Sequence, residues 1–143
     1  MSGRTYGVTT GRFYVLIGNE AKALFTEMSG LTVETEVFEY AEGGNNGFVH
    51  QLPGRTKVGR ITLKYGLTSD DKLFQWYMNI AYGVTLQRYN VSVVLYNDDA
   101  KEVRRWNFLN AYPVRWIGPQ MEAGSGAVAV ETLELAHDGM QVI

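Results

Sequence analysis

The chain has 143 residues, a formal net charge of −2 and no cysteine. This length fits one domain over residues 1–143, which can bury a stable core without disulfides. The lack of cysteine excludes disulfides, thiolate zinc sites and cysteine nucleophiles, and the 13 scattered Lys and Arg residues argue against a nucleic-acid-binding face.

Strand patterns dominate the chain. Seven segments alternate apolar and polar residues, as strands with one buried face do. These segments are 12–17, 23–28, 31–40, 60–65, 90–96, 103–109 and 127–135. The turn sequence NDDAKE separates 90–96 from 103–109, so we expect a hairpin there. The pattern predicts a mainly β fold, a small β-barrel or sandwich of about seven strands.

One amphipathic helix is expected in the sequence TSDDKLFQWYMNIAYG, packed on the outside of the strands. Thr68 or Ser69 is the expected N-cap, and Gly83 is the expected residue after the last turn. The apolar residues at helical spacing are Leu73, Trp76, Tyr77 and Ile80.

The stretch at about 41–59 has no regular period, and it lies between two expected strands. Compact domains rarely keep irregular connections longer than ~12–15 residues unless these are functional or disordered. Its apolar residues Phe48, Val49 and Leu52 would form an unusual exposed patch on a monomer. We therefore expect a functional loop that contacts another chain.

No set of side chains points to catalysis or to a bound cofactor. Glu34 and Glu36 share one strand face, so their environments do not differ as acid–base catalysis requires. His50 and His137 have no further ligand at metal-binding spacing. The glycine-rich stretch lacks the Lys-Ser/Thr pair of a phosphate-binding loop. We expect no enzymatic activity, no cofactor and no metal site.

Three long motifs follow one another along the chain. The first, over 25–68, contains FTEMSGLTVETEVFEYAEGGNN and LPGRTKVGRITLKYGLT. WNFLNAYPVRWIGP at 106–119 and VAVETLELAHDG at 128–139 complete the order. The chain resembles, over nearly its whole length, the tail-tube proteins of contractile-tailed phages and phage-like contractile injection systems. It departs from the family pattern at Tyr112, where Trp is common, and at Asp138, where Glu is common.

The resemblance implies a structural role in an inner tube. Family members form hexameric rings that stack into a hollow tube inside a contractile sheath, and the tube conducts cargo. The expected partners are other copies of this chain, the sheath protein, baseplate and cap proteins, and protein cargo in the lumen, without membrane binding. No signal peptide or apolar membrane span occurs, so assembly is expected in the bacterial cytoplasm, with release on lysis.

Two surfaces follow from this picture. The long loop is expected to contact a neighbouring ring or subunit through Glu39, Tyr40, Glu42, Gly43, Gly44, Asn45, Asn46, Phe48, Leu52, Pro53, Gly54 and Lys57. The polar faces of four strands are expected to line the lumen with Glu34, Glu36, Thr62, Lys64, Arg105, Asn107, Thr132 and Glu134.

Two alternatives stay open. The same fold serves as a tube-initiator or adaptor ring at the baseplate, which differs from a tube subunit because it does not polymerise alone. A small-molecule-binding split barrel of flavin-reductase type is a further alternative, but it needs a basic phosphate-binding cluster.

Overall fold

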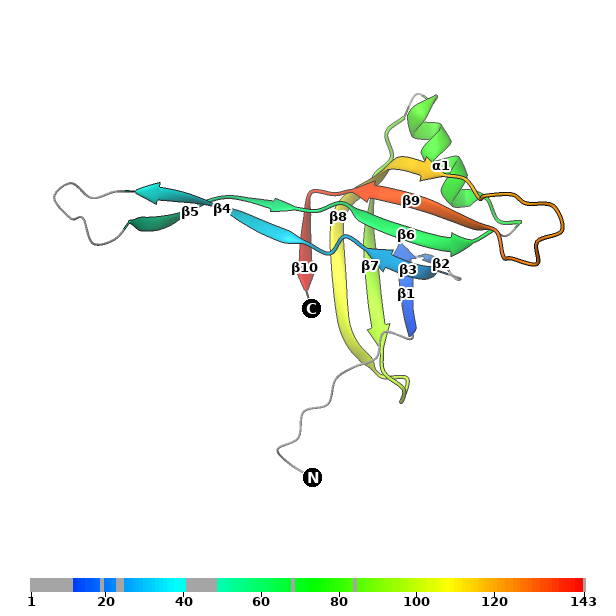
Figure 1. Ribbon diagram of the computed structural model, residues 1–143, viewed down its shortest axis with the longest axis horizontal. Coiled ribbons are helices and arrows are strands. Elements are labelled where there is room, and N and C mark those ends of the chain that lie inside the picture. The colour runs from blue at the N-terminus through cyan, green and yellow to red at the C-terminus, as the bar shows by residue number, and fades with distance from the viewer. Residues whose placement is uncertain are drawn as a thin grey trace.

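The computed structural model describes residues 12–18, 20–22, 25–40, 49–67, 69–83 and 85–142. A β-sheet body carries one helix at its surface, and a two-stranded arm extends away from it (Figure 1). The body contains an eight-stranded antiparallel sheet in the order β2-β1-β7-β8-β9-β6-β3, and β10 pairs with β8. A mainly β fold with one helix is confirmed for the described residues.

The strands of the body differ widely in length, from three residues in β2 to sixteen in β8. They span Arg12–Ile17 (β1), Glu20–Lys22 (β2), Phe25–Ser29 (β3), Ile61–Gly66 (β6), Tyr89–Tyr96 (β7), Glu102–Ile117 (β8), Val130–Ala136 (β9) and Gly139–Val142 (β10).

Strand β8 joins the two halves of the sheet. Its first half pairs with β7, and its last six residues, 112–117, pair with β9. Between these halves Asn110 has a φ of 52°, in the left-handed region that Asn tolerates better than most residues. The Asn110 backbone N–H donates to Asn90 Oδ1 (3.1 Å), and its side-chain amide donates to Asp138 (3.0 Å). The start of β7 and the turn after β9 therefore hold this position in place.

The core lies on the inner face of both sheet halves. Alternate residues of β6 and β9 point inward and are buried, which is the period-two pattern of a half-buried sheet. Phe108 from β8 and the aromatic residues Trp106 and Trp116 pack in or against this core, as do the β9 leucines. The fully buried apolar residues of β1, β6, β7 and β9 are Val15, Ile61, Leu63, Val91, Val93, Val94, Leu133 and Leu135.

Helix α1 (Lys72–Ala81) covers one end of the body (Figure 1). Trp76 is buried, and Leu73, Tyr77 and Ile80 pack against the core, as their spacing predicts. The expected N-cap is wrong: the cap position is Asp71, and the Lys72 N–H instead bonds Asp70 Oδ1 at 3.1 Å. Thr68 lies outside the described residues.

The end of the helix follows the prediction. Tyr82 is the C-cap and Gly83 follows it. A Cβ at Gly83 would overlap the carbonyl of Asn79, so glycine fits where a larger residue would not.

Each of the seven predicted segments overlaps a strand of the structure, but the prediction is incomplete. The hairpin of β7 and β8 is confirmed, with the Asn97 N–H bonding the Lys101 carbonyl across its turn. Three strands were not expected, β2, β5 and β10, and β8 continues eight residues beyond the predicted end at Leu109. Short strands carry too few alternating residues to be read from a sequence, and the proline in β8 argued against its continuation.

The arm consists of β4 (Val33–Tyr40) and β5 (His50–Val58), which pair with each other and form a separate two-stranded sheet. The irregular stretch predicted over 41–59 is therefore wrong for 50–58, while 41–48 lies outside the described residues. Between Thr35 and Val37 the register shifts, because β5 has one extra residue there. Such a bulge, with Pro53 and Gly54 beside it, hid the strand pattern of β5 from sequence reasoning.

A series of glycine substitutions tests the backbone at the base of the arm. Gly30 has a φ of 91°, and a Cβ there would overlap the carbonyl oxygen of Arg60. Gly124 has a φ of 81°, but a Cβ added there would meet no atom within 4 Å. A Cβ added at Gly126 would also meet no atom within 4 Å, and Gly126 is not in the left-handed region. Gly124→Ala should lose about 1–2 kcal/mol of the free energy of unfolding for its left-handed backbone. Gly30→Ala should lose clearly more, and Gly126→Ala should be close to neutral.

Urea unfolding of the three variants and the unchanged chain measures these differences. Equal losses at Gly30 and Gly124 would contradict the close approach at the arm's base.

Candidate assembly surfaces

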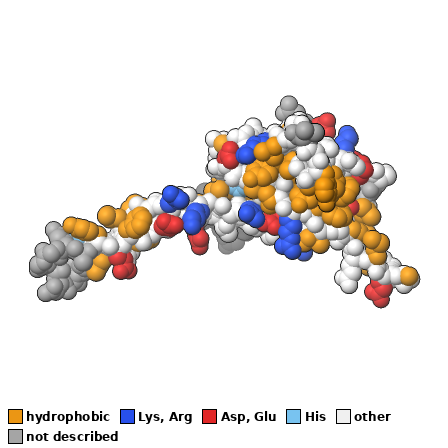
Figure 2. Space-filling model, turned by 90° about the horizontal axis from the view of Figure 1, so that it is seen from above, with side chains coloured by type: hydrophobic (Ala, Val, Ile, Leu, Met, Phe, Trp, Pro, Cys, Tyr) orange, Lys and Arg blue, Asp and Glu red, His pale blue; other side chains and the backbone are white. Residues whose placement is uncertain are grey.

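The outer part of the arm has one strongly apolar face. Phe38 pairs with Leu52, and Tyr40 pairs with His50, so these four side chains alternate onto one side of the two strands. Phe38, Tyr40 and Leu52 are 58%, 56% and 50% exposed. Figure 2 shows hydrophobic side chains gathered on the outer arm, with charged side chains nearer the body. We call these four residues the apolar arm face.

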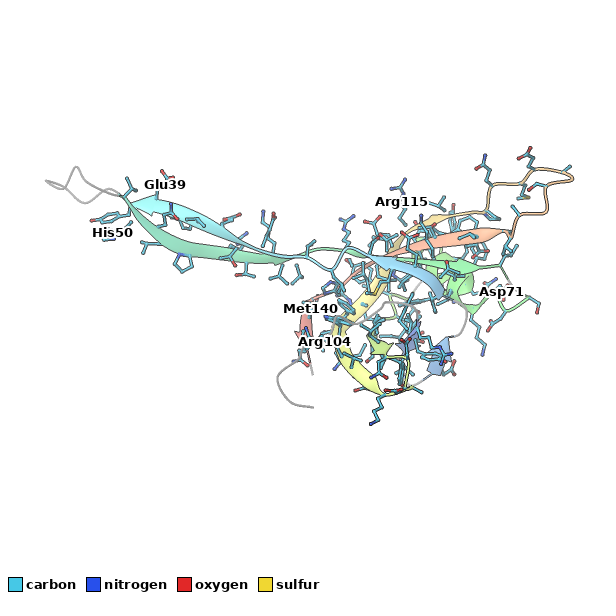
Figure 3. All side chains as sticks on the ribbon, turned by 60° about the horizontal axis from the view of Figure 1, so that its bottom comes forward. Glu39, His50, Asp71, Arg104, Arg115 and Met140 are labelled. Atoms are coloured by element: carbon cyan, nitrogen blue, oxygen red, sulfur yellow. The ribbon has the colours of Figure 1, made fainter. Side chains whose placement is uncertain are left out.

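The opposite side of the outer arm carries Val37, Glu39, Gln51 and Pro53. Glu39 and His50 lie at the end of the arm that is far from the body (Figure 3). On the apolar side the ring of Phe38 lies against Gly54, so closely that a Cβ at Gly54 would overlap the ring. An aromatic ring that covers a strand glycine stabilises that strand and fixes its register.

Polar pairs occupy the inner part of the arm. Lys57 Nζ lies 3.3 Å from Glu36 Oε1, and the hydroxyls of Thr35 and Thr56 are 3.0 Å apart. Glu34 is directly opposite Lys57. Glu34 and Glu36, which were expected on the lumen wall, therefore lie on the arm and not on the sheet of the body.

The structure brings half of the expected loop residues together. Glu39, Tyr40, Leu52, Pro53, Gly54 and Lys57 all lie on the arm strands. The others are outside the described residues: Glu42, Gly43, Gly44, Asn45, Asn46 and Phe48. Sequence reasoning missed Phe38, although its alternation with Glu39 and Tyr40 along one strand carried the signal.

Four of the expected lumen residues share one outward face of the body. Thr62 pairs with Glu134, and Lys64 pairs with Thr132, on the side of β6 and β9 opposite the core. Two ion pairs with neighbouring residues balance this face, Lys64 with Glu27 at 3.6 Å and Arg60 with Glu134 at 3.5 Å. We call the four paired residues the polar sheet face.

The other two expected lumen residues lie on the first half of β8. Ser92 Oγ donates to Asn107 Oδ1 at 2.6 Å, and Arg105 pairs with Glu102 at 2.8 Å. The hydrogen bond that Arg105 donates to the Glu102 carboxylate raises the pKa of the Arg105 guanidinium, which stays charged. These residues lie on the half of the sheet that contains β1 and β7, whereas the polar sheet face lies on β6 and β9.

Comparison with known families assigns the chain. A family model described as T4-like virus tail tube protein gp19 matches residues 9–141. The chain belongs to this family. Comparison with curated proteins yields no significant match.

Solved structures support this assignment to the tail tube family. One similar chain is in the extended-state PVC sheath/tube terminator of an extracellular contractile injection system, with TM-score 0.87, 27% identity and 99% of both chains covered. A second is in the PVC sheath-tube complex, with TM-score 0.83, 28% identity and coverage of 96% and 92%. A third is in the six-fold symmetrised baseplate of the anti-feeding prophage, with TM-score 0.76, 27% identity and coverage of 100% and 97%.

A groove of about 820 Å³ runs between α1 and the turn after β1 in this tail tube protein. Its floor contains Ile17, Trp76 and Tyr89, and Trp76 Nε1 donates to the Gln87 carbonyl at 2.8 Å. Lys72 is the one cation among its described lining residues. The groove therefore lacks the basic cluster that a flavin phosphate needs, which weakens the split-barrel alternative.

A buried polar cluster lies under the helix. Glu131 is 7% exposed, and Trp116 Nε1 donates to its Oε2 at 3.2 Å. Tyr65, opposite Glu131 on β6, buries its hydroxyl without a hydrogen-bond partner among the described residues. Burial, and then the neighbouring Glu131 carboxylate, raises the pKa of the Tyr65 hydroxyl. His137 takes no part in this cluster, because its Nε2 contacts the Gly59 carbonyl at 2.8 Å.

Within the described ranges, no three His, Asp or Glu residues are grouped as a metal site would need. No described helix is long and apolar enough to cross a membrane. The apolar arm face brings three exposed large apolar side chains together on one side of the arm.

The raised pKa of Tyr65 predicts a pH dependence of stability. Unfolded tyrosine ionises near pH 10, whereas the buried hydroxyl resists ionisation in the folded chain. The contribution of the un-ionised Tyr65 hydroxyl to the free energy of unfolding is therefore fully present below about pH 10 and is lost as the pH rises above it. Tyr65→Phe should lose less stability than the unchanged chain above pH 10, because it has no hydroxyl to ionise on unfolding.

Thermal melts between pH 7 and 11 compare the two chains, with Tyr14→Phe as an exposed control. Parallel loss of stability in the unchanged chain and in Tyr65→Phe would contradict the buried-hydroxyl account.

Proposed function

We propose that this chain forms the inner tube of a contractile injection system. Hexameric rings of the single domain, residues 1–143, stack into a hollow tube inside a contractile sheath, and sheath contraction drives the tube through a target envelope. Membership of the tail tube family supports this, as does similarity to chains in a sheath-tube complex and in a six-fold symmetrised baseplate.

The arm is the observation that carries the proposal. An isolated two-stranded hairpin is marginally stable in water, because neither of its faces is covered. This arm nevertheless exposes half or more of Phe38, Tyr40 and Leu52. A second copy of the chain that covers the apolar arm face would remove these side chains from water. The arm is therefore a neighbour-clasping and ring-stacking element.

Ring closure uses the edges of the body. Strands β2 and β3 end the strand order, so each has an edge without a partner strand among the described residues. Open edges favour pairing with another chain. A contact between unlike edges, repeated around an axis, closes into a ring. Neighbouring sheets then continue into one tube wall.

The polar sheet face lines the lumen in this arrangement. Its charges have both signs, and its Lys and Glu side chains are paired with neighbours. A wall of balanced charge does not hold a charged polymer strongly, whereas a field of one sign does. Protein cargo can then pass along the lumen. Partners outside the tube are the sheath, the baseplate and a cap, and particles assemble in the cytoplasm before release.

A second candidate function is an adaptor or terminating ring of the same fold. The similarity to a chain in the PVC sheath/tube terminator structure favours this second candidate. The two functions differ in polymerisation: a tube subunit forms rods alone, and an adaptor stops at one ring. Negative-stain images of the purified chain distinguish them.

Substitutions on the two sides of the arm test its clasping role. The double variant Tyr40→Ser and Leu52→Ser removes two large side chains of the apolar arm face but leaves Phe38 over Gly54. Rod formation should fall at least about tenfold, since burial of each large apolar side chain contributes roughly 1.5–3 kcal/mol. The matched control, Glu39→Ser and Gln51→Ser, changes the opposite side.

Light scattering and electron microscopy measure assembly, and circular dichroism checks the fold. Assembly of the apolar-face variant at the level of the unchanged chain would show that this face is not covered by a second copy.

A charge change on the polar sheet face tests the lumen assignment. Thr62→Lys with Thr132→Lys adds two cations beside Lys64. Rings should still form, because exposed charges change folding by only about 0–1 kcal/mol each. Rods should retain single-stranded DNA, and retention should fall steeply as salt is raised.

Glu34→Gln with Glu36→Gln, on the arm, changes the net charge by the same amount and serves as the control for a charge change elsewhere. Equal retention by both variants would place the DNA outside the lumen and overturn the assignment.

A further inference from the structure

The arm meets the body only at its base. Strands β4 and β5 pack on each other and have at most marginal contact with the other described elements. The nine residues of β5 make the arm roughly 30 Å long at ~3.3 Å per residue. A rotation of about 10° at the base would move the tip by about 5 Å over that length. Small changes at the base therefore decide where the apolar arm face lies.

Two glycines form the base, where the entering and leaving chains cross. A Cβ at Gly30 would overlap the Arg60 carbonyl, and a Cβ at Gly59 would overlap Thr32 Oγ1. The Gly59 N–H donates to the Thr32 carbonyl at 2.9 Å. The two chains therefore cross in close contact, through this backbone hydrogen bond and with the Thr32 side chain beside Gly59. Such a base can rotate unless the body holds it.

One side chain from the core reaches this base. His137, in the turn after β9, places Nε2 2.8 Å from the Gly59 carbonyl oxygen. A carbonyl only accepts hydrogen bonds, so the His137 Nε2–H donates. The imidazole packs edge-on against Phe108, a core residue that is 1% exposed, with ring centroids 4.9 Å apart. Its buried Nδ1 has no hydrogen-bond partner in the described part of the chain.

The second link between base and body is weaker. Arg60 pairs with Glu134 at 3.5 Å, but the Arg60 side chain is 64% exposed. Exposed ion pairs are screened by water and salt and hold geometry poorly. The hydrogen bond from His137 is short and partly buried, and its donor is fixed by the core. It is therefore the restraint that can set an angle.

We propose that His137 is a positioning residue, which sets the direction of the arm by holding the Gly59 carbonyl. This role goes beyond the proposed clasping role of the arm. Only its effect on assembly rests on that proposed role, because a correctly directed arm presents the apolar arm face to the next copy. The role explains why an imidazole occupies this site at the cost of an unpartnered Nδ1. A purely apolar side chain would pack on Phe108 equally well but could not donate.

Distance measurement by pulsed electron paramagnetic resonance tests the proposal. The chain has no cysteine, so Gln51→Cys on the arm and Arg104→Cys on β8 give two unique spin labels. Labelled chain is diluted with unlabelled chain, so that only distances within one copy are read. His137→Phe keeps the ring against Phe108 and loses the donor, while His137→Gln keeps an N–H donor at similar reach.

The unchanged chain and His137→Gln should give one narrow distance distribution. His137→Phe should give a distribution at least about twofold wider, because a hydrogen bond from the core no longer restrains the base. The distance distribution of the Arg60→Ala variant should stay narrow. Equal widths for His137→Phe and the unchanged chain would overturn the proposal, and so would a width for His137→Gln equal to that of His137→Phe.

Two further measures keep the test decisive. If His137→Phe does not fold, His137→Asn replaces it, because its shorter amide cannot reach the carbonyl. Electron microscopy of the same samples reads assembly separately from arm direction. A widened distribution with unchanged rods supports the positioning role and contradicts the clasping role of the arm, so the two failures are distinguishable.

Discussion

A two-stranded ribbon has two open faces and no interior, and this constraint governs how the tail tube chain must behave. In the body, the inward-facing apolar side chains of the strands pack together in one core, which α1 also covers. In the arm, Phe38, Tyr40 and Leu52 have only each other and the flanking residues. Their water-exposed area opposes a monomeric state and favours association with a second copy. The fold is thus complete in the body and incomplete in the arm.

The rest of the chain supplies a rigid base for that arm. Strand β8 runs through both sheet halves. Between these halves, Asn110 is held by hydrogen bonds to Asn90 and Asp138. Strand β9 pairs with both β6 and β8, so the turn that follows it is held by core strands. His137 stands in this turn and contacts the base of the arm. Few contacts therefore link the arm to the core, and core strands hold the residues that make them.

Sequence reasoning succeeded where one physical signal was strong. Period-two alternation located β1, β4, β6, β7 and β9, because each has a buried face or a regular alternation of types. The helix was found from its apolar spacing, and its start was placed too early because the acidic residues before Lys72 lie outside the helix. Strand β5 was missed, since its bulge and its Pro53-Gly54 step break the alternation.

The surfaces were harder to predict, because they depend on which strands become neighbours. Thr62, Lys64, Thr132 and Glu134 do share one face, as their alternation suggested. Glu34 and Glu36 have the same local pattern but belong to another sheet. Strand alternation tells which residues lie on the same side of one strand, and it cannot tell which sheet that strand joins. The contact of His137 with Gly59, 78 residues away, has no local signal at all.

Hydrogen exchange of the arm amides tests most directly whether a second copy covers the arm. Backbone groups of 33–40 and 50–58 that do not pair across the two strands face water in the single chain. On assembly these amides should become at least about tenfold slower to exchange, whereas core amides of β6 and β9, already protected, should change little. Arm amides that exchange at the same rate in dispersed chains and in assembled rods would contradict the account.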